Sequence, residues 1–179
     1  PLILLGCTSK KNLISLEKLK ENQAFFSDQT LAGIQNNGTY IVPTSQIIDP
    51  AGTTKTFPGR PVDLALNSNE TILAVKNMSN IVFFNTENQE IQQTLDLPVG
   101  GSTFKGIGWN SKDEKVWITD DKGYLRSAKI DENGSFVWND KIFLPGIDKG
   151  GSYPGGFAID EKHGFIYVAL NRNNTLGIV

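Results

Sequence analysis

From Gly38 onward the chain consists of short runs of β-branched and aromatic residues, and Gly, Asn, Asp and Pro separate these runs. No helical pattern of useful length appears in this part of the chain. Short runs of this kind, bounded by turn-forming residues, predict β-strands joined by tight turns. The sequence therefore indicates an all-β fold for residues 38–179.

The predicted strands repeat in the same order along the chain. We expect first strands at residues 61–67, 104–110 and 154–160, inner strands at 72–75, 116–119 and 165–169, third strands at 80–84, 123–127 and 175–179, and fourth strands at 92–97 and 140–144. The step is 44 residues from Ile72 to Val116 and 50 residues from Val116 to Ile166. Four short strands in about 40–50 residues are typical of one β-propeller blade.

A four-stranded sheet with two apolar faces can bury both only by stacking against other sheets. We therefore predict an incomplete β-propeller of about three four-stranded blades, taken from a seven-bladed ring. The blades are expected at residues 59–100, 101–150 and 151–179, the last one incomplete. The alternative is a β-sandwich whose self-similarity is accidental.

Ahead of the first full unit, residues 38–43, 46–48 and 53–57 resemble the outer strands of a further blade. Their inner strands would then lie beyond Val179, and the chain would form an open arc. We also expect tight hairpin turns at Asp120–Gly123 and at Asn133–Gly134, because Asp, Asn and Gly adopt the backbone conformations that such turns need.

The repeats resemble a known group of bacterial propellers. Residues 72–77 (Ile-Leu-Ala-Val-Lys-Asn) and 166–171 (Ile-Tyr-Val-Ala-Leu-Asn) are similar to the YVTN repeat of YncE-like and lactonase-like propellers, although residues 117–120 depart from it. The Pro-Ala-Gly at 50–52, followed by residues 57–66, is similar to the start of exported proteins in which such a propeller precedes a phosphoesterase domain of the alkaline phosphatase superfamily. The resemblance covers residues 38–179 and implies a binding or scaffold module, with the phosphoesterase domain outside this chain.

The apolar run Leu2–Leu5, followed by Gly6 and Cys7, resembles the lipobox of bacterial lipoproteins. The resemblance implies that residues 1–7 end a signal peptide and that a lipid on Cys7 anchors the protein to a membrane. Residues 8–37 are then a polar tether, and the location is the bacterial cell envelope, at the outer membrane or the periplasmic face. The alternative is a buried strand that ends in an inert thiol. We read the chain as a fragment of a longer protein.

The formal net charge is −2, and no basic cluster follows the lysines near the N-terminus, which argues against nucleic acid as a partner. The chain has one His and one Cys. His163 is expected to be a solvated turn residue, and Cys7 cannot form a disulfide within this chain. We therefore assign no catalytic residue, no metal and no cofactor, and expect this segment not to be an enzyme. The alternative is a lactonase-type hydrolase with its active site at the propeller channel.

Propellers bind ligands where the loops between strands meet at the mouth of the channel. The loops that enter the first strands place Arg60, Lys105 and Tyr153 at positions that the repeat alignment makes equivalent. Two cations at this rim favour an anionic ligand. The alternative is that the Pro and aromatic residues of these loops only pack blade against blade.

Overall fold

The computed structural model describes residues 31–36, 39–49, 51–147 and 150–179, and the chain divides into one unit that ends at Thr54 and a second that runs from Lys55 to Val179. The first unit contains a small antiparallel sheet in the order β1 (Gly33–Ile34), β2 (Tyr40–Ile41) and β3 (Ile47–Ile48). β1 lies in the segment predicted as a polar tether, and residues 53–57, predicted as a strand, form none. Cys7 lies outside the described residues.

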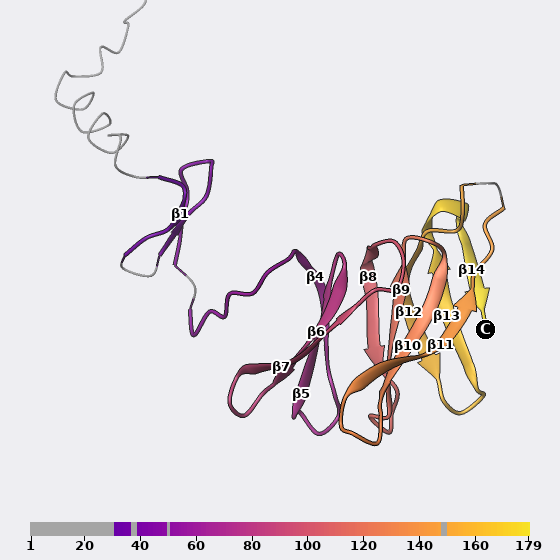
Figure 1. The fold of residues 1–179 in the computed structure, drawn as a ribbon. Helices are drawn as coiled ribbons and strands as arrows, with labels where there is room; N and C mark the ends of the chain where they lie inside the picture. The colour runs from indigo at the N-terminus through magenta and orange to yellow at the C-terminus, as the bar shows by residue number, and fades with distance from the viewer. Residues whose placement is uncertain (1–30, 37–38, 50, 148–149) are drawn as a thin grey trace, which may run out of the picture. The chain divides into compact units, whose positions relative to one another are not determined.

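Three antiparallel sheets make up the second unit, and each follows the order of the chain. The first contains β4 (Pro61–Leu66), β5 (Ile72–Asn77), β6 (Asn80–Asn85) and β7 (Glu90–Asp96); the second β8 (Ser102–Trp109), β9 (Lys115–Asp120), β10 (Tyr124–Ile130) and β11 (Phe136–Phe143); the third β12 (Pro154–Asp160), β13 (Phe165–Leu170) and β14 (Thr175–Ile178). A short 3-10 turn, Asn171–Asn173, separates β13 from β14. The sheets stand one after another (Figure 1), and their first strands are neighbours.

This arrangement is an incomplete β-propeller, as the sequence predicts. We number the sheets blades 1, 2 and 3. In each blade the face toward the next blade in the chain is the downstream face, and the opposite one is the upstream face. Both expected hairpin turns are confirmed, with left-handed glycines at Gly123 (φ 82°) and Gly134 (φ 79°).

The pairing of strands corrects the predicted repeat by one residue. Leu66 pairs with Leu73 in blade 1, and Trp109 pairs with Val116 in blade 2. Leu73, and not Ile72, is therefore the counterpart of Val116. The correction matters because neighbouring residues of a strand point to opposite faces, so that a shift of one residue exchanges the two faces of the blade.

Aromatic side chains form the centre of the core between blades 1 and 2. The rings of Phe83 and Phe136 are stacked, with centroids 3.6 Å apart and planes 3° apart, and Trp109 meets both rings edge-on. Around them lie buried residues of both blades: Ala74, Ile81, Val116, Ile118 and Ala128. A second cluster fills the space between blades 2 and 3 and contains Trp117, Leu125, Leu144, Ile166, Val168 and Leu170.

Polar contacts hold the same blades in register along the rims. The carboxylate of Asp113 in blade 2 accepts hydrogen bonds from the backbone nitrogen of Ser68 (2.8 and 2.9 Å) and from its hydroxyl (2.6 Å) in blade 1. Glu161 in blade 3 accepts one from the backbone nitrogen of Ser111 in blade 2, at 2.7 Å. Each downstream blade thus caps a hairpin loop of the blade before it.

We predict that Phe83→Ala lowers the free energy of unfolding by about 3–5 kcal/mol, because it removes a fully buried ring and leaves a cavity between two blades. Urea unfolding measured by tryptophan fluorescence tests this. Val99→Ala is the matched control, since Val99 is exposed and should change stability by less than about 0.5 kcal/mol. A loss of under about 1 kcal/mol for Phe83→Ala would show that the stacked pair is not central to this interface.

Candidate functional site

A cavity of about 320 Å³ lies where the first strands of blades 2 and 3 begin. Its lining consists of Thr103, Phe104, Lys105, Tyr153, Pro154, Gly155, Gly156, Ala169 and Asn171. The volume is near the lower end of the roughly 300–1,000 Å³ of small-molecule sites. The lining residues include a lysine, two aromatic residues, an asparagine and two glycines, which suits a small polar ligand.

A long bulge in β8 forms the blade 2 side of the cavity. Ser102 pairs with Asp120 and Ile107 pairs with Ile118, so residues 103–106 all lie opposite Thr119. The bulge ends at Gly106, whose φ of 105° is in the left-handed region. A Cβ there would lie 2.4 Å from the carbonyl oxygen of Gly155, so the close approach of blades 2 and 3 requires glycine. Bulges commonly redirect side chains beside binding sites, and this one directs Phe104 and Lys105 to the cavity.

The entry to β12 forms the blade 3 side. Tyr153 has a φ of 46°, an uncommon conformation for a residue with a side chain. The fully buried hydroxyl of Ser152 donates to the carbonyl oxygen of Leu144 at 2.5 Å, and the Tyr153 carbonyl accepts from the backbone nitrogen of Asn171 at 3.3 Å. These bonds hold the backbone on both sides of Tyr153 in the conformation that brings its side chain to the cavity.

Two of the three rim residues expected from the sequence lie together. Lys105 and Tyr153 both line the cavity, whereas Arg60 does not. The guanidinium carbon of Arg60 lies 5.5 Å from the ring centroid of Phe104, close enough for a cation–π contact with a residue of the cavity wall. Lys105 has a side chain that is 76% exposed, and its Nζ lies 3.9 Å from Asp63 Oδ1, which is a weak ion pair.

The expected equivalence of these three residues is wrong for Lys105. Arg60 and Tyr153 each precede a proline that pairs with the end of the inner strand, Pro61 with Asn77 and Pro154 with Leu170. Lys105 instead lies within the bulge opposite Thr119. Lys105 reaches the rim because the bulge in blade 2 is longer than the bulges in blades 1 and 3. The composition of a loop does not indicate how long such a bulge is.

Lys76 lies next to the candidate site, and the sequence did not point to it. Its side chain is fully buried between blades 1 and 2. Its Nζ donates to oxygen atoms of blade 2, at 3.1 Å to Thr103 Oγ1, 2.9 Å to the Lys105 carbonyl, 3.0 Å to the Gly106 carbonyl and 3.2 Å to Thr119 Oγ1. In the sequence, Lys76 follows four apolar residues of an inner strand, Ile72–Val75, and this pattern could have indicated that the lysine is buried.

Burial lowers the pKa of Lys76 from 10.5 to about 7, while the negative charges of Asp63 and Asp120 act in the opposite direction. The oxygen cage of Lys76 also adjoins the cavity. Thr103 lines the cavity, and Thr119 Oγ1 lies 3.0 Å from the carbonyl oxygen of Gly155, which lines it too. The amine therefore supports the wall of the cavity from behind.

Other polar groups of interest have structural partners. Asp120 is buried, accepts from the backbone nitrogens of Lys122 and Tyr124 and pairs with Arg126 Nε at 2.6 Å, so it holds the hairpin turn together. His163 is exposed in its turn, as expected, with Nδ1 2.8 Å from Asp160. Among the described residues, no three His, Cys, Asp or Glu side chains form a group that could hold a metal ion. In the same part of the chain no helix is long and apolar enough to cross a bilayer.

No protein-family model and no curated protein sequence matches the chain. Several solved structures match its fold. The periplasmic gluconolactonase of Pseudomonas aeruginosa is 20% identical with a TM-score of 0.56, over 70% of this chain and 37% of that one. A protein from Lactobacillus plantarum is 15% identical with a TM-score of 0.51, over 73% and 40% of the two chains, and a functionally unknown protein from Desulfotomaculum acetoxidans is 14% identical with a TM-score of 0.51, over 74% and 40%.

These likenesses concern the fold, and the chain spans less than half the length of each of these structures. The class of protein is therefore that of the β-propellers.

We predict that Lys76→Met removes a distinct pH dependence of stability. In the folded protein Lys76 loses its proton near pH 7, whereas in the unfolded chain it keeps it to about 10.5. Between these values the unfolded state binds more protons, so this lysine makes the stability rise with pH by up to about 1.4 kcal/mol per pH unit, with no contribution to the slope below pH 7. Urea unfolding from pH 6 to about 10 should show this rise in the wild type relative to Lys76→Met.

The matched control is Lys112→Met, since Lys112 is exposed in a hairpin loop. Its stability should follow the wild type across the whole pH range. Parallel curves for the wild type and Lys76→Met would mean that the buried amine keeps its proton in the folded state.

Proposed function

We propose that this chain is a ligand-binding module whose site is the cavity between blades 2 and 3. The observation that carries the proposal is that Lys105 and Tyr153 line one cavity of about 320 Å³ together with the glycine backbone of β12. The positive charge of Lys105, whose exposed side chain is held only by a weak ion pair with Asp63, favours a negatively charged ligand, and the aromatic residues Phe104 and Tyr153 offer flat apolar surfaces. A small organic acid, such as a sugar acid, has both properties.

The propeller supplies rigidity to this site. The loop that carries Lys105 starts a strand whose partner, β9, is buried on both faces, and the Lys76 cage ties the bulge of blade 2 to blade 1. A site built on rigid loops loses little conformational entropy when it binds a ligand.

We further propose that the protein is exported and anchored by a lipid on Cys7, and that this propeller positions or regulates a phosphoesterase domain of a longer parent. Support comes from the Leu-Gly-Cys order at residues 5–7 and from the Pro-Ala-Gly opening at residues 50–52. Incorporation of labelled palmitate by the full-length parent in a bacterial host, lost in Cys7→Ser, tests the anchor. Incorporation that is equal in the two proteins would exclude Cys7 as the lipid site.

The second candidate is a lactonase-type hydrolase that uses the same cavity. It is favoured by the likeness of the fold to the periplasmic gluconolactonase, a protein named for its action on a lactone. The two candidates share the chemistry of the ligand, since a sugar lactone and its acid differ by one water molecule. They differ in whether the ligand is turned over.

We predict that gluconate and citrate, titrated calorimetrically, bind to the wild type and that Lys105→Ala weakens the binding by at least about tenfold, which corresponds to about 1.4 kcal/mol. Tyr153→Phe tests the phenol hydroxyl without changing the ring. Lys112→Ala is the control for loss of one exposed positive charge, and it should bind as the wild type does.

Equal affinity of the wild type and Lys105→Ala, or no binding of either probe, would contradict the proposed site. Hydrolysis of glucono-1,5-lactone above the spontaneous rate, followed in a pH-stat and abolished in both cavity variants, would replace the binding module by the hydrolase.

A further inference from the structure

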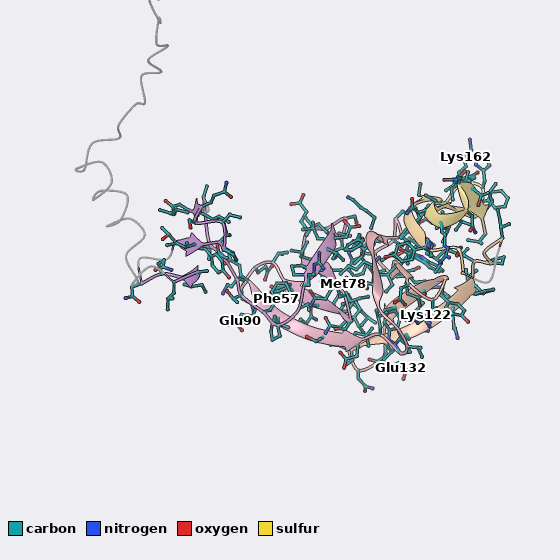
Figure 2. All side chains as sticks on the ribbon, turned by 90° about the horizontal axis from the view of Figure 1, so that it is seen from above. Phe57, Met78, Glu90, Lys122, Glu132 and Lys162 are labelled. Atoms are coloured by element: carbon teal, nitrogen blue, oxygen red, sulfur yellow. The ribbon has the colours of Figure 1, made fainter. Side chains whose placement is uncertain are left out.

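The charge of Lys76 is not required for the stacking of the blades. Its counterparts are Thr119 in β9 and Ala169 in β13, since each of the three directly precedes the inner-strand residue that pairs with the first residue of its blade. Met78 and Lys122, labelled in Figure 2, mark the turns that follow β5 and β9. Blades 2 and 3 thus fold with an uncharged residue at the position where blade 1 carries a lysine.

Thr119 makes the corresponding contact between blades without a charge. Its Oγ1 lies 3.0 Å from the carbonyl oxygen of Gly155, just as Lys76 Nζ lies 2.9 Å from the carbonyl oxygen of Lys105. Lys105 and Gly155 are themselves counterparts, since each stands two residues before the point where pairing with the inner strand resumes. A hydroxyl is therefore sufficient to bridge two blades at this position. Because a buried ammonium costs far more free energy than a buried hydroxyl, its presence indicates a role beyond packing.

The ammonium of Lys76 lies directly behind the wall of the cavity between blades 2 and 3. Its Nζ is 3.1 Å from Thr103 Oγ1 and 2.9 Å from the carbonyl oxygen of Lys105, and both of these residues line the cavity. A charge in a dry interior acts on a neighbouring charge with little screening. The side chain of Lys105 is 76% exposed, so water and salt screen its charge.

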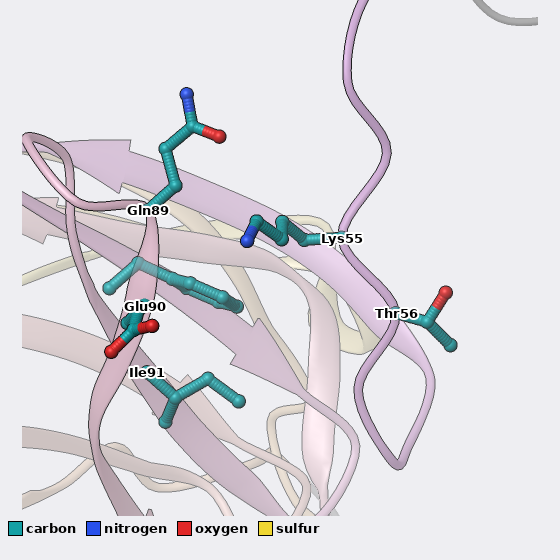
Figure 3. A pocket seen from close by; sticks show the side chains of 6 residues that line it. Lys55, Thr56, Gln89, Glu90 and Ile91 are labelled. Carbon is teal, nitrogen blue, oxygen red and sulfur yellow. The ribbon is translucent and has the colours of Figure 1, made fainter.

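A second hollow in the second unit, of about 310 Å³, has a different electrostatic setting. Its lining consists of Lys55, Thr56, Phe84, Gln89, Glu90 and Ile91 (Figure 3). The two charged residues of this lining, Lys55 and Glu90, are both exposed and opposite in sign. Water screens both charges and each offsets the other, so this hollow attracts an anion much less than the cavity in front of Lys76.

The charged groups that face Lys76 determine how its proton responds to a ligand. Burial lowers the pKa of the amine to about 7, while Asp63 of β4 and Asp120 of β9 act in the opposite direction. Asp63 is also paired with Lys105 of β8, and Asp120 with Arg126 of β10. The neighbouring strand β6, Asn80–Asn85, carries no charged residue. Near neutral pH the amine therefore gains or loses its proton in response to one further charge nearby.

We propose that Lys76 determines the charge selectivity of the cavity, and that an anionic ligand binds together with a proton taken up by this amine. This coupling rests on the proposed function, because it needs a ligand in the cavity. Lys76 acts without touching the ligand. The ammonium favours a negative charge on the other side of Thr103, and the negative charge in turn favours the ammonium over the neutral amine. The affinity therefore falls as the pH rises above about 7, by up to about tenfold per pH unit.

Calorimetric titration of gluconate into the wild type, in Tris and in triethanolamine, tests the uptake of a proton. The two buffers release different heats when they give up a proton, and neither is an anion that competes for the site. At about pH 8 we expect an uptake of at least about 0.3 proton per bound gluconate. Gluconate keeps its single charge between about pH 7 and 9, so the expected fall in affinity over this range belongs to the protein.

Lys76→Met separates the charge of the lysine from its packing. This variant should bind without proton uptake, and it should reduce the preference for gluconate over its neutral analogue gluconamide by at least about fivefold near neutral pH. Lys105→Ala should bind gluconate more weakly and still take up the proton, because Lys76 is intact. The control Lys112→Met removes an exposed charge in a hairpin loop and should match the wild type in affinity, preference and proton uptake.

Two results would overturn the coupling and leave the binding module in place. One is gluconate that binds to the wild type without proton uptake. The other is a Lys76→Met variant that weakens gluconate and gluconamide equally, as a purely structural support would. Absence of gluconate binding to the wild type would overturn the coupling and the proposed function together. Circular dichroism checks that Lys76→Met is folded, and the proton uptake of the wild type tests the coupling without any variant.

Discussion

Each blade of this protein is a sheet with two apolar faces, and the need to cover both faces governs the rest of the structure. The central strands β5 and β6 carry buried residues on both sides, so neither face of blade 1 can remain in water without cost. Stacking satisfies this requirement for the downstream face of blade 1, through the Phe83–Phe136 pair, and for both faces of blade 2. The position of the cavity follows from the stacking, because the loops of neighbouring blades meet where their first strands begin.

Close stacking also forces polar groups into the interface, and the structure pairs them across it. The side chain of Gln93 in blade 1 both donates to the Phe136 carbonyl, at 2.7 Å, and accepts from the Phe136 backbone nitrogen, at 2.6 Å. Trp109 Nε1 donates to the Ala65 carbonyl at 3.1 Å. Buried polar groups are costly without such partners, so these bonds fix the register of one blade on the next as well as compensating for lost water.

The sequence was sufficient to predict the fold but only part of the site. Repeated runs such as residues 154–160 predicted β12 with its observed bounds, since alternation and turn residues are local properties that a sequence displays. The bulge at residues 103–106 depends on which residue of β9 each one opposes, and that pairing is not a local property. Lys105 therefore reached the cavity for a different reason from the one predicted. Lys76 was missed because a lysine in a strand is ordinarily exposed, and its burial depends on oxygen atoms supplied by residues 103–119.

The dependence of Lys76 on later residues has a consequence for the order of events during synthesis. Its oxygen partners are made after it, so while blade 2 is still missing, the amine remains in water and carries its full charge. At that stage it stands on the same exposed face as Ala74, Ile81 and Phe83, a surface that would otherwise favour aggregation. A charge within an apolar strand acts as a gatekeeper against such association. The arrival of blade 2 removes the gatekeeper at the moment when the face it protects becomes covered.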